Sequence, residues 1–189
     1  ANKNIEDFEL SPKGERVLFV ARGDIFTAPI EKGPTRNLTN TSNAHDKWAR
    51  WSPDGSKIAF ISDMSGEEQI YLIDQKGSGK PVQLTTQFNC MLSPIKWSPD
   101  GKYLAASDKD GKLYVVTVST KKVTEIADHE FGEIYYYNWS PDGRYLAFSM
   151  RDWNYYWSIY IWSSTDSKVR RITGEYFNEY APTWDPDGN

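Results

Sequence analysis

Hydrophobic and polar side chains alternate with a period of two residues over much of this chain. The clearest alternating runs lie at residues 16–20, 57–61, 103–106 and 145–148. Alternation of this kind is typical of strands that bury one face. No stretch repeats its hydrophobic residues at the wider spacing of an amphipathic helix. The pattern therefore predicts an all-β protein.

Two further strand-like segments follow each of these runs before the next turn signal. The first set of segments comprises residues 24–28, 69–73, 112–116 and 158–162. The second set comprises residues 35–39, 82–85, 122–126 and 169–173. Together with an extended stretch before each turn, these segments predict repeats of four antiparallel strands.

The turn signal between the first two strands is a recurring pentapeptide, WSPDG, with weaker variants near the two ends. Its copies lie at Leu10–Gly14, Trp51–Gly55, Trp97–Gly101, Trp139–Gly143 and Trp184–Gly188. Successive copies begin 41 to 46 residues apart. This period is close to that of four-stranded propeller blades, so the sequence predicts a β-propeller of antiparallel blades.

The residue types of the pentapeptide suit a tight turn. In the second copy, Pro53 presets φ for the second position of a type I turn, and Asp54 suits the third. Gly55 accepts the left-handed conformation that follows. Such a turn reverses one strand onto the next, which explains why the motif recurs once in each repeat.

We predict about four blades, as an open fragment of a six- or seven-bladed ring. The expected boundaries are 1–41, 42–86, 87–128 and 129–174, with 175–189 as the first strand and turn of a fifth blade. The chain opens and closes with the same type of strand, so its ends are redundant for ring closure. Because an open ring exposes strand edges, we expect self-association. A closed four-bladed ring with an overhang is the alternative.

Composition narrows the classes of function. The chain has 15% aromatic residues and a formal net charge of −4, and its lysines and arginines are scattered singly. This distribution argues against a nucleic-acid partner. The apolar runs are only strand-length, which argues against a membrane helix. Cys90 is the only cysteine, so we expect no internal disulfide. A cytoplasmic location is favoured, and a periplasmic one stays open.

The repeats resemble the WSPDG-type propeller repeats of TolB, of the prolyl-oligopeptidase family and of the tricorn protease with its homologues. A more specific likeness lies in Ile5–Phe8 leading into Arg16–Phe26, with a short connection at Arg22–Asp24. This combination is similar to the opening blade of the second, larger propeller of tricorn-like serine peptidases. Asn178–Trp184 resembles a later blade of the same ring.

The tricorn resemblance implies a noncatalytic role for this chain. Propellers of that family form channels that filter peptides and conduct them toward a serine-protease core elsewhere in the polypeptide. The implied partners are peptide substrates of the parent enzyme, the remaining propeller blades and the protease core. Two alternatives stay open, namely a TolB-like protein-binding module and the propeller lid of a prolyl-oligopeptidase-like hydrolase.

Few residues could form a catalytic or metal site. His45 and His129 each precede an inner strand and stand beside an acid, while Ser52 and Ser140 lie in turns. Because such residues commonly satisfy backbone groups, we expect no catalytic residue. Turn acids such as Asp54 are about one blade apart, whereas calcium needs roughly six to eight oxygens within reach. We therefore expect no metal and no cofactor.

The most individual feature is an aromatic run in the expected fourth blade. Trp139, Tyr160 and Trp162 fall on repeat positions and are expected to fill the space between blades. Other members lie in an expanded connection between the second and third strands, where propellers commonly place function. We predict that this connection forms a rim that contacts a peptide or a neighbouring domain, with packing as the alternative. The rim consists of Arg151, Asp152, Trp153, Tyr155, Tyr156 and Trp157.

Polar side chains occupy the position just before the bulky residue of each turn motif. They are Glu9, Arg50, Lys96, Asn138 and Thr183. Because successive side chains of a strand point to opposite faces, these five point away from the bulky residue. We predict that they pair between blades or approach a central channel, where mixed charges favour the passage of extended polar chains.

Overall fold

The chain consists of antiparallel strands and turns. The computed structural model describes residues 5–41 and 43–188, and no helix occurs within these ranges. The same ranges therefore contain no helix that is long and apolar enough to cross a membrane. Residues 1–4, 42 and 189, which include the expected start of the second blade, lie outside them. The fold divides into two compact units, with the boundary between Ile95 and Lys96.

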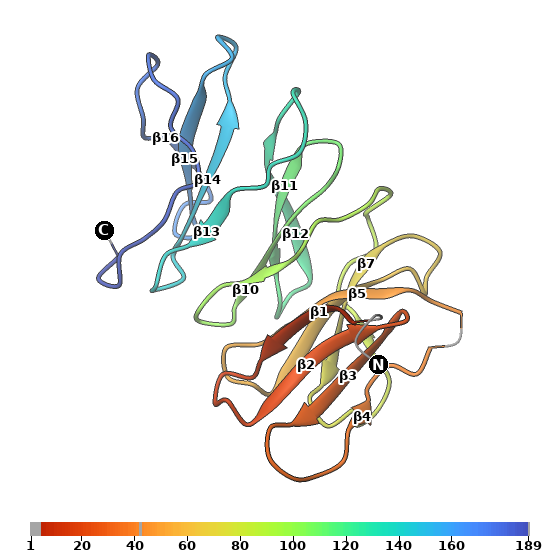
Figure 1. Ribbon diagram of the computed structural model, residues 1–189. Coiled ribbons are helices and arrows are strands. Elements are labelled where there is room, and N and C mark those ends of the chain that lie inside the picture. The colour runs from red at the N-terminus through yellow and green to blue at the C-terminus, as the bar shows by residue number, and fades with distance from the viewer. Residues whose placement is uncertain (1–4, 42, 189) are drawn as a thin grey trace. The chain divides into compact units, whose positions relative to one another are not determined.

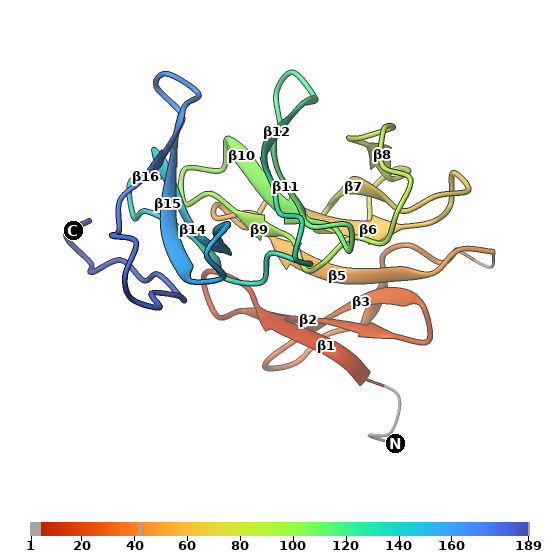
Figure 2. The same ribbon diagram turned by 90° about the horizontal axis from the view of Figure 1, so that it is seen from above.

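The first unit contains two four-stranded antiparallel sheets (Figure 1). The first sheet has the order β1 (Ile5–Leu10), β2 (Arg16–Ala21), β3 (Asp24–Pro29) and β4 (Arg36–Asn37). The second sheet has the order β5 (Asp46–Trp51), β6 (Lys57–Ser62), β7 (Gln69–Asp74) and β8 (Val82–Gln83). Strand β5 contacts β1, β2 and β3, so the second sheet packs on the first (Figure 2).

The second unit contains two further sheets of the same kind. The third sheet consists of β9 (Lys96–Trp97), β10 (Tyr103–Ser107), β11 (Lys112–Thr117) and β12 (Lys122–Asp128). The fourth sheet consists of β13 (Tyr137–Trp139), β14 (Tyr145–Arg151), β15 (Trp157–Ser163) and β16 (Val169–Arg171). The predicted all-β architecture of four-stranded antiparallel blades is thus confirmed.

The recurring pentapeptide forms the turn between the first and second strands of each sheet. In the second sheet, the Gly55 amide donates to the Ser52 carbonyl at 2.8 Å, and the φ of Gly55 is 71°. The Ser52 hydroxyl donates to the Asp54 carboxylate at 2.6 Å and accepts the Lys57 amide at 2.9 Å. The same bonds recur in the third and fourth sheets. Each WSPDG turn therefore satisfies its own polar groups.

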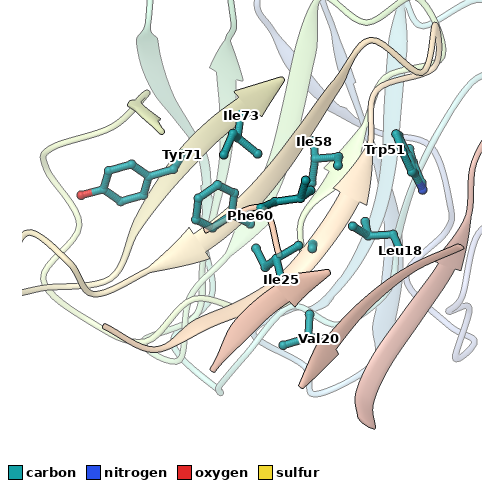
Figure 3. Close-up of a cluster of buried hydrophobic side chains, with 10 residues drawn as sticks. Leu18, Val20, Ile25, Trp51, Ile58, Phe60, Tyr71 and Ile73 are labelled. Atoms are coloured by element: carbon teal, nitrogen blue, oxygen red, sulfur yellow. The ribbon is translucent and has the colours of Figure 1, made fainter. Parts of the chain in front are cut away.

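A cluster of buried aliphatic and aromatic side chains forms the core of the first unit (Figure 3). It consists of Leu18, Val20, Ile25, Leu38, Ala49, Trp51, Ile58, Phe60, Tyr71 and Ile73. The rings of Phe60 and Tyr71 stack with their centroids 5.8 Å apart. Burial of each large side chain contributes about 1.5–3 kcal/mol, so this cluster holds the first two sheets together.

The core of the second unit relies more on aromatic rings. Trp139 stacks on Tyr103 with the ring centroids 5.9 Å apart. Trp162 meets both rings edge-on, at 5.8 Å from Tyr103 and 6.1 Å from Trp139. Because Tyr103 lies on the third sheet and the two tryptophans lie on the fourth, these rings join the two sheets of this unit.

Several strand lengths differ from the prediction. The second strand of each sheet runs one to three residues further than the alternation indicates, and β14 reaches Arg151. Strands β4, β8 and β16 have only two or three residues, whereas β12 has seven. Residues 175–188, expected to include the first strand of a fifth blade, contain no strand.

Candidate functional site

The predicted aromatic rim lies at the turn between β14 and β15. The strand ladder continues as far as the pair Arg151 and Trp157, so the loop itself is only residues 152–156. The observed connection is therefore shorter than predicted, because Arg151 and Trp157 belong to strands. Trp153 is 81% exposed, and Tyr155 and Tyr156 are exposed as well. Three aromatic rings of the rim thus face the solvent.

Asp152 fixes this loop to the neighbouring strands β15 and β16. Its carboxylate accepts hydrogen bonds from the hydroxyls of Ser158 and Tyr160, and it forms an ion pair with Arg171 at 2.9 Å. The Asp152 amide donates to the Tyr156 carbonyl at 3.0 Å, which closes the loop. Burial, together with the bond to Asp152, raises the pKa of Tyr160 to about 12. The Tyr160 hydroxyl therefore keeps its proton and remains a donor at neutral pH.

Arg151 and Trp157 form a cation–π pair at the ends of the two strands. The guanidinium carbon lies 5.1 Å from the centroid of the indole ring. The His129 ring contacts the same indole at 6.0 Å, and its Nε2 accepts the Arg151 amide at 3.1 Å. Because an amide can only donate, Nε2 carries a lone pair and Nδ1 donates its proton to the Gly132 carbonyl at 2.6 Å. Both nitrogens of His129 are thus engaged in structural bonds.

Two neighbouring segments carry further exposed rings that the sequence prediction did not assign to the rim. These rings are Phe131, Tyr176, Phe177 and Tyr180. The Phe131 ring lies 5.1 Å from the Tyr155 ring. The segment 174–180 runs beside the loop, because the Asn154 side chain donates to the Glu175 carbonyl at 2.9 Å. The run of aromatic residues after the last strand was the available sequence signal.

Two of the five predicted polar residues lie in the first unit, and each bonds to the first strand of the other sheet. Glu9 on β1 accepts the Trp51 amide at 2.7 Å. Arg50 on β5 forms an ion pair with Asp7 on β1. Burial raises the pKa of Glu9, while the Trp51 amide and the charge of Arg50 act in the opposite direction. These contacts tie β1 to β5.

The other three polar positions lie in the second unit. The Lys96 ammonium donates to the Tyr137 carbonyl at 2.7 Å and to the Asn138 side chain at 3.0 Å. The Asn138 side-chain amide in turn donates to the Pro182 carbonyl at 3.1 Å. Thr183 is exposed and lies outside any strand. Lys96 and Asn138 therefore link successive segments of this unit.

The remaining residues that could suggest chemistry are two turn serines and His45. The Ser140 hydroxyl donates to Asp142 at 2.7 Å, as Ser52 does to Asp54. The His45 amide donates to the Asp63 carboxylate at 2.7 Å. Within residues 5–41 and 43–188, no group of three His, Cys, Asp or Glu side chains is placed to share a metal ion.

The family model of the tricorn protease second β-propeller domain matches residues 5–189. The chain belongs to this family. The likeness inferred from the turn motifs and from Ile5–Phe8 is therefore confirmed, and the fold of this tricorn-type propeller segment is that of a β-propeller. Blade count and closure of a complete ring stay predictions.

Several known proteins are similar to this tricorn-type propeller segment. Dipeptidyl-peptidase 5 of Porphyromonas gingivalis is 27% identical over 151 residues, which cover 68% of this chain and 22% of that protein. The tricorn protease homolog of Saccharolobus solfataricus is 26% identical over 175 residues, which cover 93% and 16%. The chain thus spans less than a quarter of the length of these relatives.

Solved structures agree on the fold. The crystal structure of the tricorn protease superposes with a TM-score of 0.83 at 22% identity, covering 98% of this chain and 18% of that one. A putative TolB from Agrobacterium tumefaciens superposes with a TM-score of 0.70 at 24% identity, covering 97% and 67%. At these identities the likeness concerns the fold, and function has to be argued from the site.

Proposed function

We propose that this tricorn-type propeller segment is noncatalytic and guides peptide substrates toward a protease core elsewhere in its polypeptide. The observation that carries the proposal is the match of residues 5–189 to a propeller domain of a protease. Two relatives are named as a dipeptidyl-peptidase and as a tricorn protease homolog. In this proposal, the partners are peptide substrates, the remaining blades and the protease core.

The aromatic rim supports contact with peptides. Trp153, Tyr155 and Tyr156 present flat apolar rings, and each ring also carries a polar group that can bond to a peptide backbone. Such side chains have few rotatable bonds, so they lose little conformational entropy when a ligand covers them. A peptide that passes the rim can therefore be held weakly without a sequence-specific pocket.

The rim is also preorganised. The three bonds to the Asp152 carboxylate and the bond from Asn154 to the Glu175 carbonyl fix the loop before any ligand arrives. A loop that is already ordered does not have to be ordered on binding, which favours affinity. The fixed loop therefore favours a role as a contact surface over a role as a mere connection between two strands.

The test compares long and short substrates in the full-length polypeptide. In the Trp153→Ala and Tyr156→Ala double variant, we expect kcat/KM for a long peptide to fall about three- to tenfold, because rim contacts are lost. Hydrolysis of a capped dipeptide, which is too short to reach from the rim to a distant core, should not change. The matched Trp153→Phe and Tyr156→Phe variant keeps both rings and should retain most of the activity toward the long peptide.

Three outcomes would count against guidance by the rim. Unchanged hydrolysis of the long peptide would show that the rings are not used. An equal loss for both substrates would place the effect at the protease core. A large fall in melting temperature of the alanine variant would show that the rings pack within the protein, as the alternative prediction has it.

A further inference from the structure

One repeat position carries different residue types in the two units. It is the first residue of the second strand, two places after the glycine of the turn motif. In the second unit, Tyr103 stacks on Trp139 with centroids 5.9 Å apart, and Tyr145 stacks on Trp184 at 6.3 Å. In the first unit, the equivalent residue of the first sheet is Arg16. No second ring is therefore supplied at the corresponding place.

A cleft of about 220 Å³ occupies this place in the first unit. It lies between the turn that follows β1 and the turn that follows β5, and Lys13, Arg16, Trp51, Asp54 and Gln75 contribute to its lining. Sites for small molecules usually measure about 300–1,000 Å³, so this cleft is better matched to a single side chain.

Among the described residues, no carboxylate forms an ion pair with the guanidinium of Arg16. Its Nη2 donates hydrogen bonds to the carbonyl and hydroxyl of Thr27 at 2.9 and 3.0 Å and to the Pro34 carbonyl at 3.4 Å. Nε is buried and has no acceptor among the described residues. Burial and the charge of Arg36 lower the pKa of Arg16. A nearby anion would favour the charged form of Arg16 and so act against both causes.

The charged residues around Arg16 do not neutralise it. Within the described part of the chain, no ion pair includes Arg16 or Lys13. The two carboxylates of the lining are Glu15 and Asp54. The Asp54 carboxylate accepts hydrogen bonds from the Ser52 hydroxyl and from the amide and hydroxyl of Ser56, which hold it against its own turn. Glu15 forms no ion pair with either cation of the cleft.

The Trp51 indole beside this cleft also differs from its counterpart in the second unit. Its indole is 5% exposed and its Nε1 finds no acceptor among the described residues. The equivalent Nε1 of Trp139 in the second unit donates to the Lys96 carbonyl at 3.1 Å. The first unit thus differs from the second in two ways at this place, since it has a cation instead of a ring and a free indole donor. The presence of a cation in place of a ring favours an acceptor group as ligand.

We propose that this cleft binds the carboxylate of an acidic side chain on a peptide segment, with Arg16 and Lys13 as the cationic partners. A guanidinium fits a carboxylate well, because its planar N–H groups can form charge-assisted hydrogen bonds. The site lies in the first unit and uses no residue of the aromatic rim. Its existence is therefore independent of peptide guidance by the rim.

The experiment uses nuclear magnetic resonance on the full chain with two capped peptides, acetyl-Ala-Glu-Ala-amide and acetyl-Ala-Gln-Ala-amide. The glutamate peptide is expected to shift the Arg16 Nε–H and Trp51 Nε1–H signals, whereas the glutamine peptide leaves them in place. Arg16→Gln should weaken binding of the glutamate peptide about tenfold, because a charge-assisted bond is lost. Lys109→Gln removes the same charge from an exposed site outside the cleft and should bind like the unaltered chain.

A second variant keeps the proposal falsifiable if Arg16→Gln does not fold. Arg16→Tyr restores the residue type of Tyr103, so we expect it to stack on Trp51, retain the fold and lose the glutamate peptide. Equal shifts with both peptides would overturn the carboxylate assignment. Undiminished binding by either folded Arg16 variant, or no shift with the glutamate peptide, would overturn the site.

Discussion

The two units form the same turn but fill the space beside it differently. In the second unit, Trp139 packs against the rings of Tyr103 and Trp162. In the first unit, Trp51 belongs to a mainly aliphatic cluster, and Arg16 stands where the second unit has a tyrosine. The comparison teaches that the repeat fixes the residues of the turn, whereas the first residue of the following strand is open to change. Individual features of this propeller segment arise at such positions.

The largest expected effect tests whether corresponding hairpins of the two units are equally constrained. A Cβ at Gly111 would lie 2.2 Å from the His129 carbonyl oxygen, and Gly111 has a φ of 92°. Gly66 has a φ of 106° but open space around it. We expect Gly111→Ala to lower the free energy of unfolding by about 4 kcal/mol and Gly66→Ala by about 1–2 kcal/mol. Urea denaturation measures both, and equal losses would show that the two hairpins are similarly constrained.

A smaller effect isolates the indole hydrogen bond. Trp139→Phe and Trp51→Phe both replace an indole with a smaller ring that lacks Nε1. Of the two indoles, Trp139 donates from Nε1 to the Lys96 carbonyl, whereas the Nε1 of Trp51 finds no acceptor among the described residues. We expect Trp139→Phe to be more destabilising by about 1 kcal/mol, the usual worth of one such bond. The comparison is made by chemical denaturation of the two variants. An equal or larger loss for Trp51→Phe would mean that its indole nitrogen does have an acceptor.

The smallest effect concerns a feature that the two units share. Hydrogen bonds from the Ser52 and Ser140 hydroxyls are the main cause that lowers the pKa of Asp54 and Asp142 to about 2. A carboxylate whose pKa is lower in the folded state contributes stability above its unfolded pKa of about 4 and loses it as the pH falls toward 2. Melting temperature should therefore decline over this range.

Single replacements of these aspartates separate the turns from other acid-labile groups. In Asp54→Asn and Asp142→Asn, the decline in melting temperature between about pH 4 and pH 2 should be shallower than in the unaltered chain. The two variants should resemble each other, because the turn is the same in both units. A decline that is just as steep in both would assign the acid sensitivity to other carboxylates.

The fold was predictable because its main signals are local. The bonds of Ser52, Asp54 and Gly55 lie within six residues of chain, so the residue types alone indicate the turn. The alternating runs likewise show which strands follow. Less local features were missed, since the extension of β14 to Arg151 depends on its pairing with Trp157.

The candidate site was only partly predictable for the same reason. The sequence indicated the exposed rings of Trp153 and Tyr156 because they interrupt the repeat pattern. It did not show that Phe131 contacts the Tyr155 ring, because that contact brings together residues from different loops. The cleft beside Arg16 also escaped prediction, since it appears only when the position is compared with Tyr103 in the folded units.

The self-contained WSPDG turn has a consequence for the history of such chains. Because its serine, aspartate and glycine satisfy one another, the turn needs no partner from another blade in order to form. A duplicated gene segment would therefore carry a working hairpin to its new location. Whole repeats could be gained or lost in this way. The loops and the first residue of each second strand could then diverge separately in each copy.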